Sequence, residues 1–118
     1  MQIQINTDHN IEGQEPLVAW VRGHLETSLA RFNSQITRVE VHLSDESGKR
    51  STGGDKKCRM EVRIANHQPL STSEHADSVD QAVKKTSDKL YRLIETTLGR
   101  IHDKAIHHSP EGTSGDSP

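Results

Sequence analysis

The sequence predicts an α+β fold, a two-layer sandwich with the element order β-α-β-β-β-α, in which two helices pack on one face of a four-stranded sheet. Four segments alternate apolar and polar residues, and two longer segments carry apolar residues at steps of three and four. The chain has only 118 residues, of which 30% are hydrophobic, so it can build one core. A sheet with one apolar face buries that face under two amphipathic helices.

The alternating segments predict strands over residues 1–6, 36–44, 56–65 and 70–75. Val39, Val41 and Leu43 form the inward face of the second strand. If the first two strands run parallel, the first helix forms a right-handed crossover between them, and the remaining strands can pair as antiparallel hairpins. Pro69 precedes the fourth strand, which we expect to be short and to lie at or near an edge.

The first helix is predicted from Pro16 to about Phe32, with Glu15 near its positive end. Its apolar stripe is Leu17, Trp20, Val21, Leu25, Ser28 and Phe32. The second helix begins after an N-cap at Asp77 or Ser78 and continues to about Lys104. Its stripe is Val79, Ala82, Val83, Thr86, Leu90, Leu93, Ile94, Thr97 and Ile101. We therefore expect a domain over residues 1–104 and a disordered polar tail over 105–118.

Composition excludes several classes of protein. The formal net charge of -2 excludes a globally basic nucleic-acid binder, and a single cysteine excludes a disulfide framework. The sequence has no apolar run of the roughly 20 residues that a membrane span needs. It also has no secretory signal, so we expect a cytoplasmic protein without membrane contact.

Catalytic and metal-binding patterns are weak. The eight histidines are scattered over different elements, which argues against a metal site. Cys58 falls at an inward strand position, and Gly53-Gly54 lacks the spacing of a phosphate-binding loop. We expect no enzyme activity, no cofactor and no small-molecule substrate.

Positive charge is concentrated in two stretches: residues 47–64 carry a net +4 and residues 84–104 a net +3. On the second helix, Lys85, Lys89, Arg92 and Arg100 fall on one flank of the apolar stripe. Such a flank is either a solvated surface or a site that neutralises backbone phosphates. Three aromatic residues are too few for base stacking on the sheet.

Two motifs resemble the ribosome hibernation factors, the family of the ribosome-associated inhibitor and the hibernation-promoting factor, often labelled sigma-54 modulation protein. The first is Met1-Gln-Ile-Gln-Ile followed by Asn10-Ile-Glu12. The second is Ala82-Val83 with Asp88-Lys-Leu-Tyr-Arg92 in the closing helix. The chain ends near residue 118, and in length it resembles the short form of the family.

This resemblance implies a non-enzymatic protein that occupies the decoding and tRNA channel of the small ribosomal subunit. It would inhibit translation in starved or stationary cells, with the ribosomal RNA as partner and a monomer off the ribosome. The implied RNA contacts are Lys89 and Arg92 within the motif, Lys85 and Arg100 by helical geometry, and Arg22 and Arg31 as the cations of the first helix.

Two alternatives remain open. His24 and Thr27 stand where relatives often hold Lys, so a diverged member could serve as a protein-interaction or stress-regulatory module with weak or no ribosome binding. The segment from Ser47 to Lys57 is either a second RNA contact or a solvated hairpin; its cations are Lys49, Arg50, Lys56 and Lys57.

Overall fold

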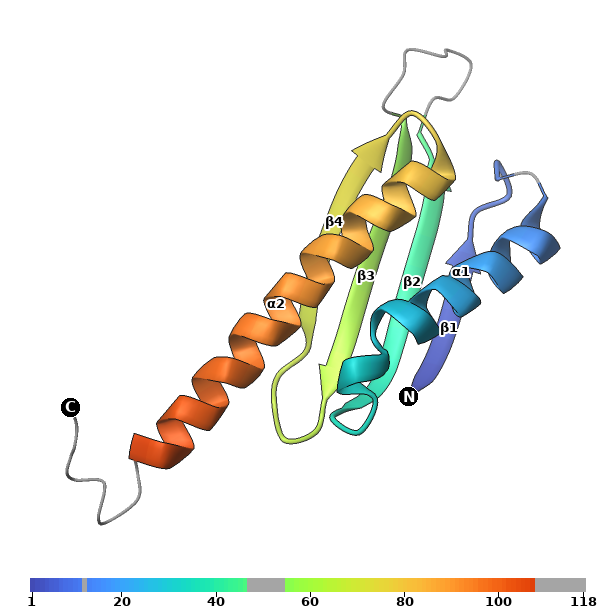
Figure 1. Ribbon diagram of the computed structural model, residues 1–118. Coiled ribbons are helices and arrows are strands. Elements are labelled where there is room, and N and C mark those ends of the chain that lie inside the picture. The colour runs from blue at the N-terminus through green and yellow to red at the C-terminus, as the bar shows by residue number, and fades with distance from the viewer. Residues whose placement is uncertain (12, 47–54, 108–118) are drawn as a thin grey trace.

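The computed structural model describes residues 1–11, 13–46 and 55–107, with side chains as far as residue 101. Its elements are β1 (Gln2–Thr7), α1 (Gln14–Ser28), a 3-10 turn (Ala30–Phe32), β2 (Ile36–Asp45), β3 (Lys56–Ile64), β4 (Leu70–Ala76) and α2 (Val79–His107). Both helices lie on the same side of the sheet (Figure 1). The predicted element order and two-layer arrangement are therefore confirmed.

The sheet has the strand order β1-β2-β3-β4. β1 and β2 are parallel, which is the condition for the crossover, and β2–β3 and β3–β4 are antiparallel, as expected for hairpins. β4 is an edge strand, and α2 packs over β3 and β4 while α1 lies toward β1. The opposite face of the sheet is left without a covering helix (Figure 1).

The core lies between the two layers. Its largest fully buried side chains include Leu25 and Leu29 from the α1 region, Val39, Val41, Met60 and Val62 from the sheet, and Leu90 and Ile94 from α2. Because strand residues alternate between faces, these apolar positions leave polar residues on the open face.

The predicted first helix is too long by one turn. α1 ends at Ser28, and Leu29 takes φ -106° and ψ 12°, which interrupts the helix before the 3-10 turn. Leu29 at the break and Phe32 at the end of the 3-10 turn are both in the core, at 0% and 4% exposure. Trp20, assigned to the apolar stripe, instead lies at its margin and is 37% exposed.

Of the two candidate caps for α2, Ser78 is the one used, because its Oγ accepts a hydrogen bond from the Gln81 amide at 3.3 Å. A helix of 29 residues is about 43 Å long, whereas the ten residues of β2 span about 33 Å. The end of α2 therefore extends past the sheet (Figure 1), where Ile101 is 41% exposed.

α2 continues to His107, three residues beyond its predicted end at Lys104. The rest of the predicted tail, residues 108–118, lies outside the described residues, as does the segment 47–54 with Lys49 and Arg50. The two described ends of that segment are joined by a hydrogen bond from the Glu46 amide to the Asp55 carbonyl at 2.8 Å.

Candidate nucleic-acid interface

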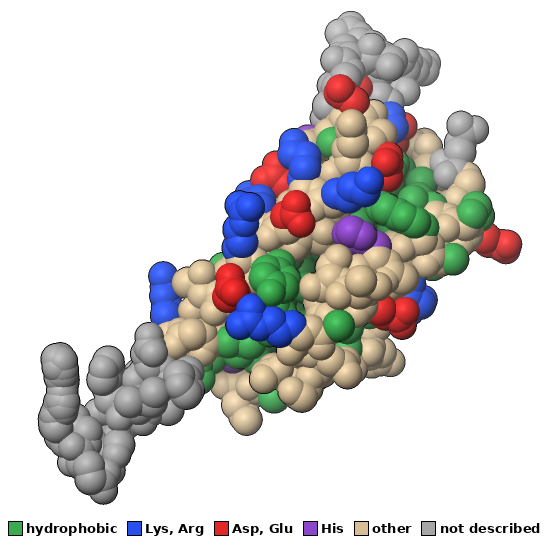
Figure 2. Space-filling model, viewed as in Figure 1, with side chains coloured by type: hydrophobic (Ala, Val, Ile, Leu, Met, Phe, Trp, Pro, Cys, Tyr) green, Lys and Arg blue, Asp and Glu red, His purple; other side chains and the backbone are tan. Residues whose placement is uncertain are grey.

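The structure places Lys85, Lys89, Arg92 and Arg100 on the side of α2 that borders β4, and we call these four residues the cationic flank. Lys85 and Lys89 contact β4 directly, and Arg92 and Arg100 line a shallow hollow together with Ser71 and Thr72 of β4. Figure 2 shows Lys and Arg side chains gathered along this edge of α2. The four cations predicted from helical geometry therefore share one surface.

Glu74 of β4 lies beneath two of these cations. Its Oε2 is 2.7 Å from Lys89 Nζ, and its Oε1 is 3.9 Å from Lys85 Nζ. Lys85 Nζ also donates a hydrogen bond to the His75 carbonyl at 3.0 Å. The hydrogen bond from Lys89, together with the positive charges nearby, lowers the pKa of the Glu74 carboxyl. Half of the cationic flank therefore already has a counter-charge.

Arg92 and Arg100 are exposed, and neither forms an ion pair with another described residue. Leu93 and Thr96 complete the hollow between them and β4. A guanidinium presents a planar fork of N–H donors that matches the oxygens of a phosphate. These two arginines are therefore the members of the flank best prepared to bind an anion.

Arg22 and Arg31, the two RNA contacts predicted on the α1 side, lie away from the cationic flank and form hydrogen bonds with other parts of the protein. Arg22 Nη1 donates to the Ile3 carbonyl at 2.8 Å. Arg31 Nη1 donates to Tyr91 Oη at 3.0 Å and to Glu95 Oε2 at 2.8 Å. These hydrogen bonds, that to Tyr91 foremost, raise the pKa of Arg31. Both arginines connect elements of the protein, and the structure does not join them to the cationic flank.

The seam between α1 and α2 contains a cluster that the sequence analysis did not find. His24 stacks on Trp20 with ring centroids 5.3 Å apart, and its Nε2 lies 3.0 Å from Ser87 Oγ. Lys84 Nζ lies 6.0 Å from the centre of the Trp20 ring. Burial lowers the pKa of His24 against the opposing effect of Asp88, so the imidazole is neutral at pH 7.

Other chemistry has little support in the described part of the chain. Burial raises the pKa of the Cys58 thiol to about 12, so at neutral pH the sulfur is not a nucleophile. Within the described residues, no three His, Cys, Asp or Glu side chains gather closely enough to hold a metal ion. Neither α1 nor α2 has the length and apolar character that crossing a membrane requires.

Residues 3–102 match the family described as Sigma 54 modulation protein / S30EA ribosomal protein. The chain belongs to this family. No curated protein sequence matches it significantly.

Two solved structures share the fold of this family member. The N-terminal domain of Protein Y from Thermus thermophilus has a TM-score of 0.65 and 18% sequence identity, covering 82% of this chain and 99% of that one. A ribosomal subunit interface protein from Coxiella burnetii has a TM-score of 0.64 and 14% identity, covering 84% of this chain and 99% of that one.

The family match covers α1 and α2 as far as residue 102 and includes every residue of the cationic flank. Helical spacing predicted the flank, but it did not reveal Glu74 as the counter-charge of the flank. Glu74 occupies an inward position of the predicted fourth strand, the face that packs on α2. An acidic residue on the helix-facing side of an edge strand was the signal available in the sequence.

Proposed function

We propose that this member of the S30EA ribosomal protein family binds the small ribosomal subunit and rests its cationic flank on ribosomal RNA. The protein occupies the channel of the decoding and tRNA sites and inhibits translation under starvation or in stationary phase. The observation that carries the proposal is a single surface with four cations in a chain of this family. The Coxiella burnetii protein with the same fold is itself described as a ribosomal subunit interface protein.

The flank suits the RNA backbone better than the bases. Arg92 and Arg100 are available for phosphates at once, while Lys85 and Lys89 exchange Glu74 for phosphate when RNA arrives. Contacts of this kind release counterions, so binding is independent of sequence and sensitive to salt. Inhibition then needs no chemistry, because a protein in the channel excludes the other ligands of that site.

A second candidate function is a protein-interaction or stress-regulatory module with weak ribosome binding. One observation favours it: Glu74 neutralises part of the flank, in a chain whose formal net charge is already -2. The two functions differ in what the flank contributes to ribosome binding.

Cosedimentation with ribosomes at graded salt tests the proposal. The variant Arg92→Gln/Arg100→Gln removes two available cations from the flank. The matched control Arg63→Gln/Lys84→Gln removes two exposed cations elsewhere. If each arginine neutralises one phosphate, the flank variant lowers the slope of log K against log salt by about 1.4 to 1.8, and the control leaves it unchanged.

Translation in a cell-free extract supplies the second measurement, with inhibition expected from the wild type and the control and lost in the flank variant. Wild-type protein that fails to sediment with ribosomes even at low salt would overturn the proposal. A flank variant that binds as tightly as the control would overturn the role of the flank, whereas weak ribosome binding by the wild type would favour the second candidate.

A further inference from the structure

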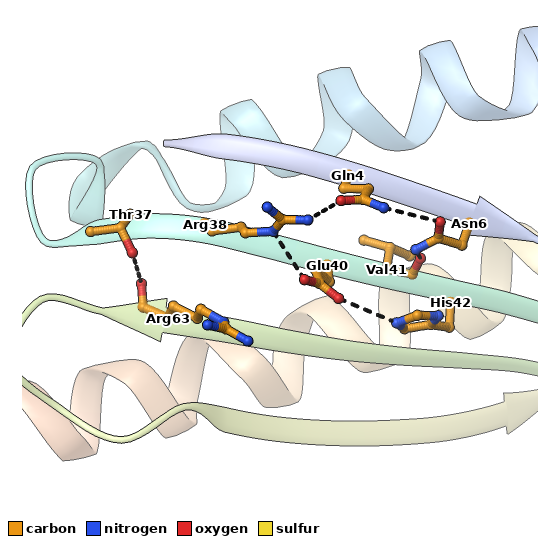
Figure 3. Close-up of polar contacts among 8 residues, drawn as sticks. All are labelled: Gln4, Asn6, Thr37, Arg38, Glu40, Val41, His42 and Arg63. Atoms are coloured by element: carbon orange, nitrogen blue, oxygen red, sulfur yellow. Dashed lines mark hydrogen bonds and ion pairs between the residues drawn. The ribbon is translucent and has the colours of Figure 1, made fainter.

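The open face of the sheet carries polar side chains on all four strands. Figure 3 shows this face with the helices behind the sheet, and Gln4, Arg38, Glu40 and His42 lie on it. Arg38 Nε lies 3.0 Å from Glu40 Oε2, and Arg38 also donates a hydrogen bond to Gln4. Residues directly opposite each other on neighbouring strands project from the same face. The strand register therefore sorts these side chains into rows across the sheet.

On β2, β3 and β4, two adjacent rows contain only side chains that can donate hydrogen bonds, and we call these six residues the donor grid. Asn6 of β1 lies beside His42, outside the grid. One row is Ser44 opposite Lys57 opposite His75, and the next is His42 opposite Arg59 opposite Ser73. Hydroxyl, ammonium, guanidinium and imidazole groups all donate hydrogen bonds. None of the six positions of the grid holds a carboxylate that would repel an anion.

Carboxylates lie at the border of the grid and contact its histidines. Glu40 Oε1 is 3.7 Å from His42 Nε2, and Glu46 Oε1 is 2.9 Å from His75 Nε2. At the centre, Arg59 is exposed and Lys57 is half-buried, and neither has an ion-pair partner among the described side chains. The two central cations are therefore available to an external anion.

The charge pattern continues beyond the grid. The next row places Glu40 opposite Glu61, and the row after it places Arg38 opposite Arg63. Like charges directly opposite each other destabilise a sheet. A row of one sign is therefore best tolerated beside a row of the opposite sign, as the contact between Arg38 and Glu40 shows. The Glu40–Glu61 row repels phosphate, so it marks one boundary of the donor grid for a bound polyanion.

The size of the grid indicates the form of the ligand. Three strands at about 4.8 Å spacing and two rows about 7 Å apart give a flat patch of about 10 by 7 Å. Such a patch holds a few successive phosphates of one strand. It has no aliphatic or aromatic anchor for a protein partner and no ring on which a base could stack.

We infer that the donor grid binds the phosphodiester backbone of a single-stranded RNA segment. This second RNA contact lies on the face of the protein opposite the helices and rests on the proposed function, because a protein held in an RNA-lined channel meets RNA on more than one side. Lys57 and Arg59 form the ion pairs with phosphate, and Ser44 and Ser73 donate the surrounding hydrogen bonds. His42 and His75 lie at two corners of the grid, where Nε2 of each faces a glutamate.

NMR titration of the full chain with a 12-nucleotide oligouridylate tests the grid without ribosomes. The background variant Arg92→Gln/Arg100→Gln weakens the flank, so the remaining amide shifts should centre on residues 42–44, 57–59 and 73–75. In this background, Arg59→Gln should weaken binding about fivefold at 0.1 M salt if one phosphate contact is lost. Arg63→Gln is the matched control, because it is also exposed on the open face of β3 but lies outside the grid.

The inference is overturned if the shifts fall on α2 or do not occur, or if Arg63→Gln weakens binding as much as Arg59→Gln. Equal binding of a 12-residue polyglutamate peptide would also overturn it, since the partner would then be an acidic protein. Thermal unfolding of each variant confirms that it is folded. Failure of the proposed function shows in ribosome sedimentation of the wild type, which this titration does not use.

Discussion

Replacing Glu74 by Gln should make this protein bind RNA more tightly. The carboxylate holds Lys89 at 2.7 Å and Lys85 at 3.9 Å, so it competes with phosphate for two of the four cations of the flank. Glutamine keeps the size of the side chain and removes its charge, and the formal net charge rises from -2 by one unit. Because Glu74 lies near the surface, the fold should tolerate the change.

The magnitude follows from the number of cations released. Each additional phosphate that is neutralised steepens the salt dependence by about 0.7 to 0.9 and tightens binding about five- to eightfold at 0.1 M salt. We therefore expect Glu74→Gln to tighten binding about fivefold if only Lys89 gains a phosphate, and by more if Lys85 also does.

Filter binding to ribosomes over a range of salt concentrations measures both quantities. Glu26→Gln is the matched control, because it removes one exposed carboxylate on α1, away from the flank. An affinity of Glu74→Gln equal to that of the wild type would refute the reasoning, since Glu74 would then not compete with RNA. An equal gain in Glu26→Gln would show that only the total charge matters.

Four further predictions concern the core and the neighbouring groups. Leu90→Ala should lower the free energy of unfolding in urea by about 2 to 5 kcal/mol, whereas Ile101→Ala, at a 41% exposed position, should change it little. Cys58, with a pKa of about 12 against an ordinary 9.0, should react with iodoacetamide at pH 8 about 1000-fold more slowly in the folded than in the unfolded chain. Arg31→Gln should leave ribosome affinity within about twofold of the wild type, because the exposed Arg31 guanidinium is already bound by Tyr91 and Glu95. The pKa of His24 is lowered in the folded state, so on acidification the unfolded chain binds a proton before the folded chain does. The free energy of unfolding should therefore fall as the pH drops below about 6.5. His24→Gln should reduce this fall.

Much of the fold could be predicted because its signals are local. The alternation of Val39, Val41 and Leu43 indicates a strand with one buried face, whatever the surrounding fold. Pro69, just before the fourth strand, correctly predicted that this strand lies at an edge of the sheet. The end of α1 could not be predicted in this way. A continuous helix would also place Leu29 and Phe32 on one face, so the apolar pattern does not reveal that the helix ends before Leu29.

For the site, too, local spacing could be predicted, whereas contacts between distant segments could not. Helical spacing alone placed the four cations of the flank on one side of α2, and the structure confirms that placement. The assignment of Arg22 and Arg31 to RNA stays a prediction, and the structure gives each of them partners within the protein. Their partners come from β1 and α2, which the local sequence around each arginine does not reveal.

The sequence by itself determined the order of the elements, the faces they bury and the flank of α2, because each of these depends on a period of two or of 3.6 within one segment. The tertiary structure decided which charges meet. Glu74 lies under Lys89, and Arg59 lies between His42 and Ser73, because separate segments pair in one register. A shift of one residue in that pairing would turn every side chain of a strand to the other face.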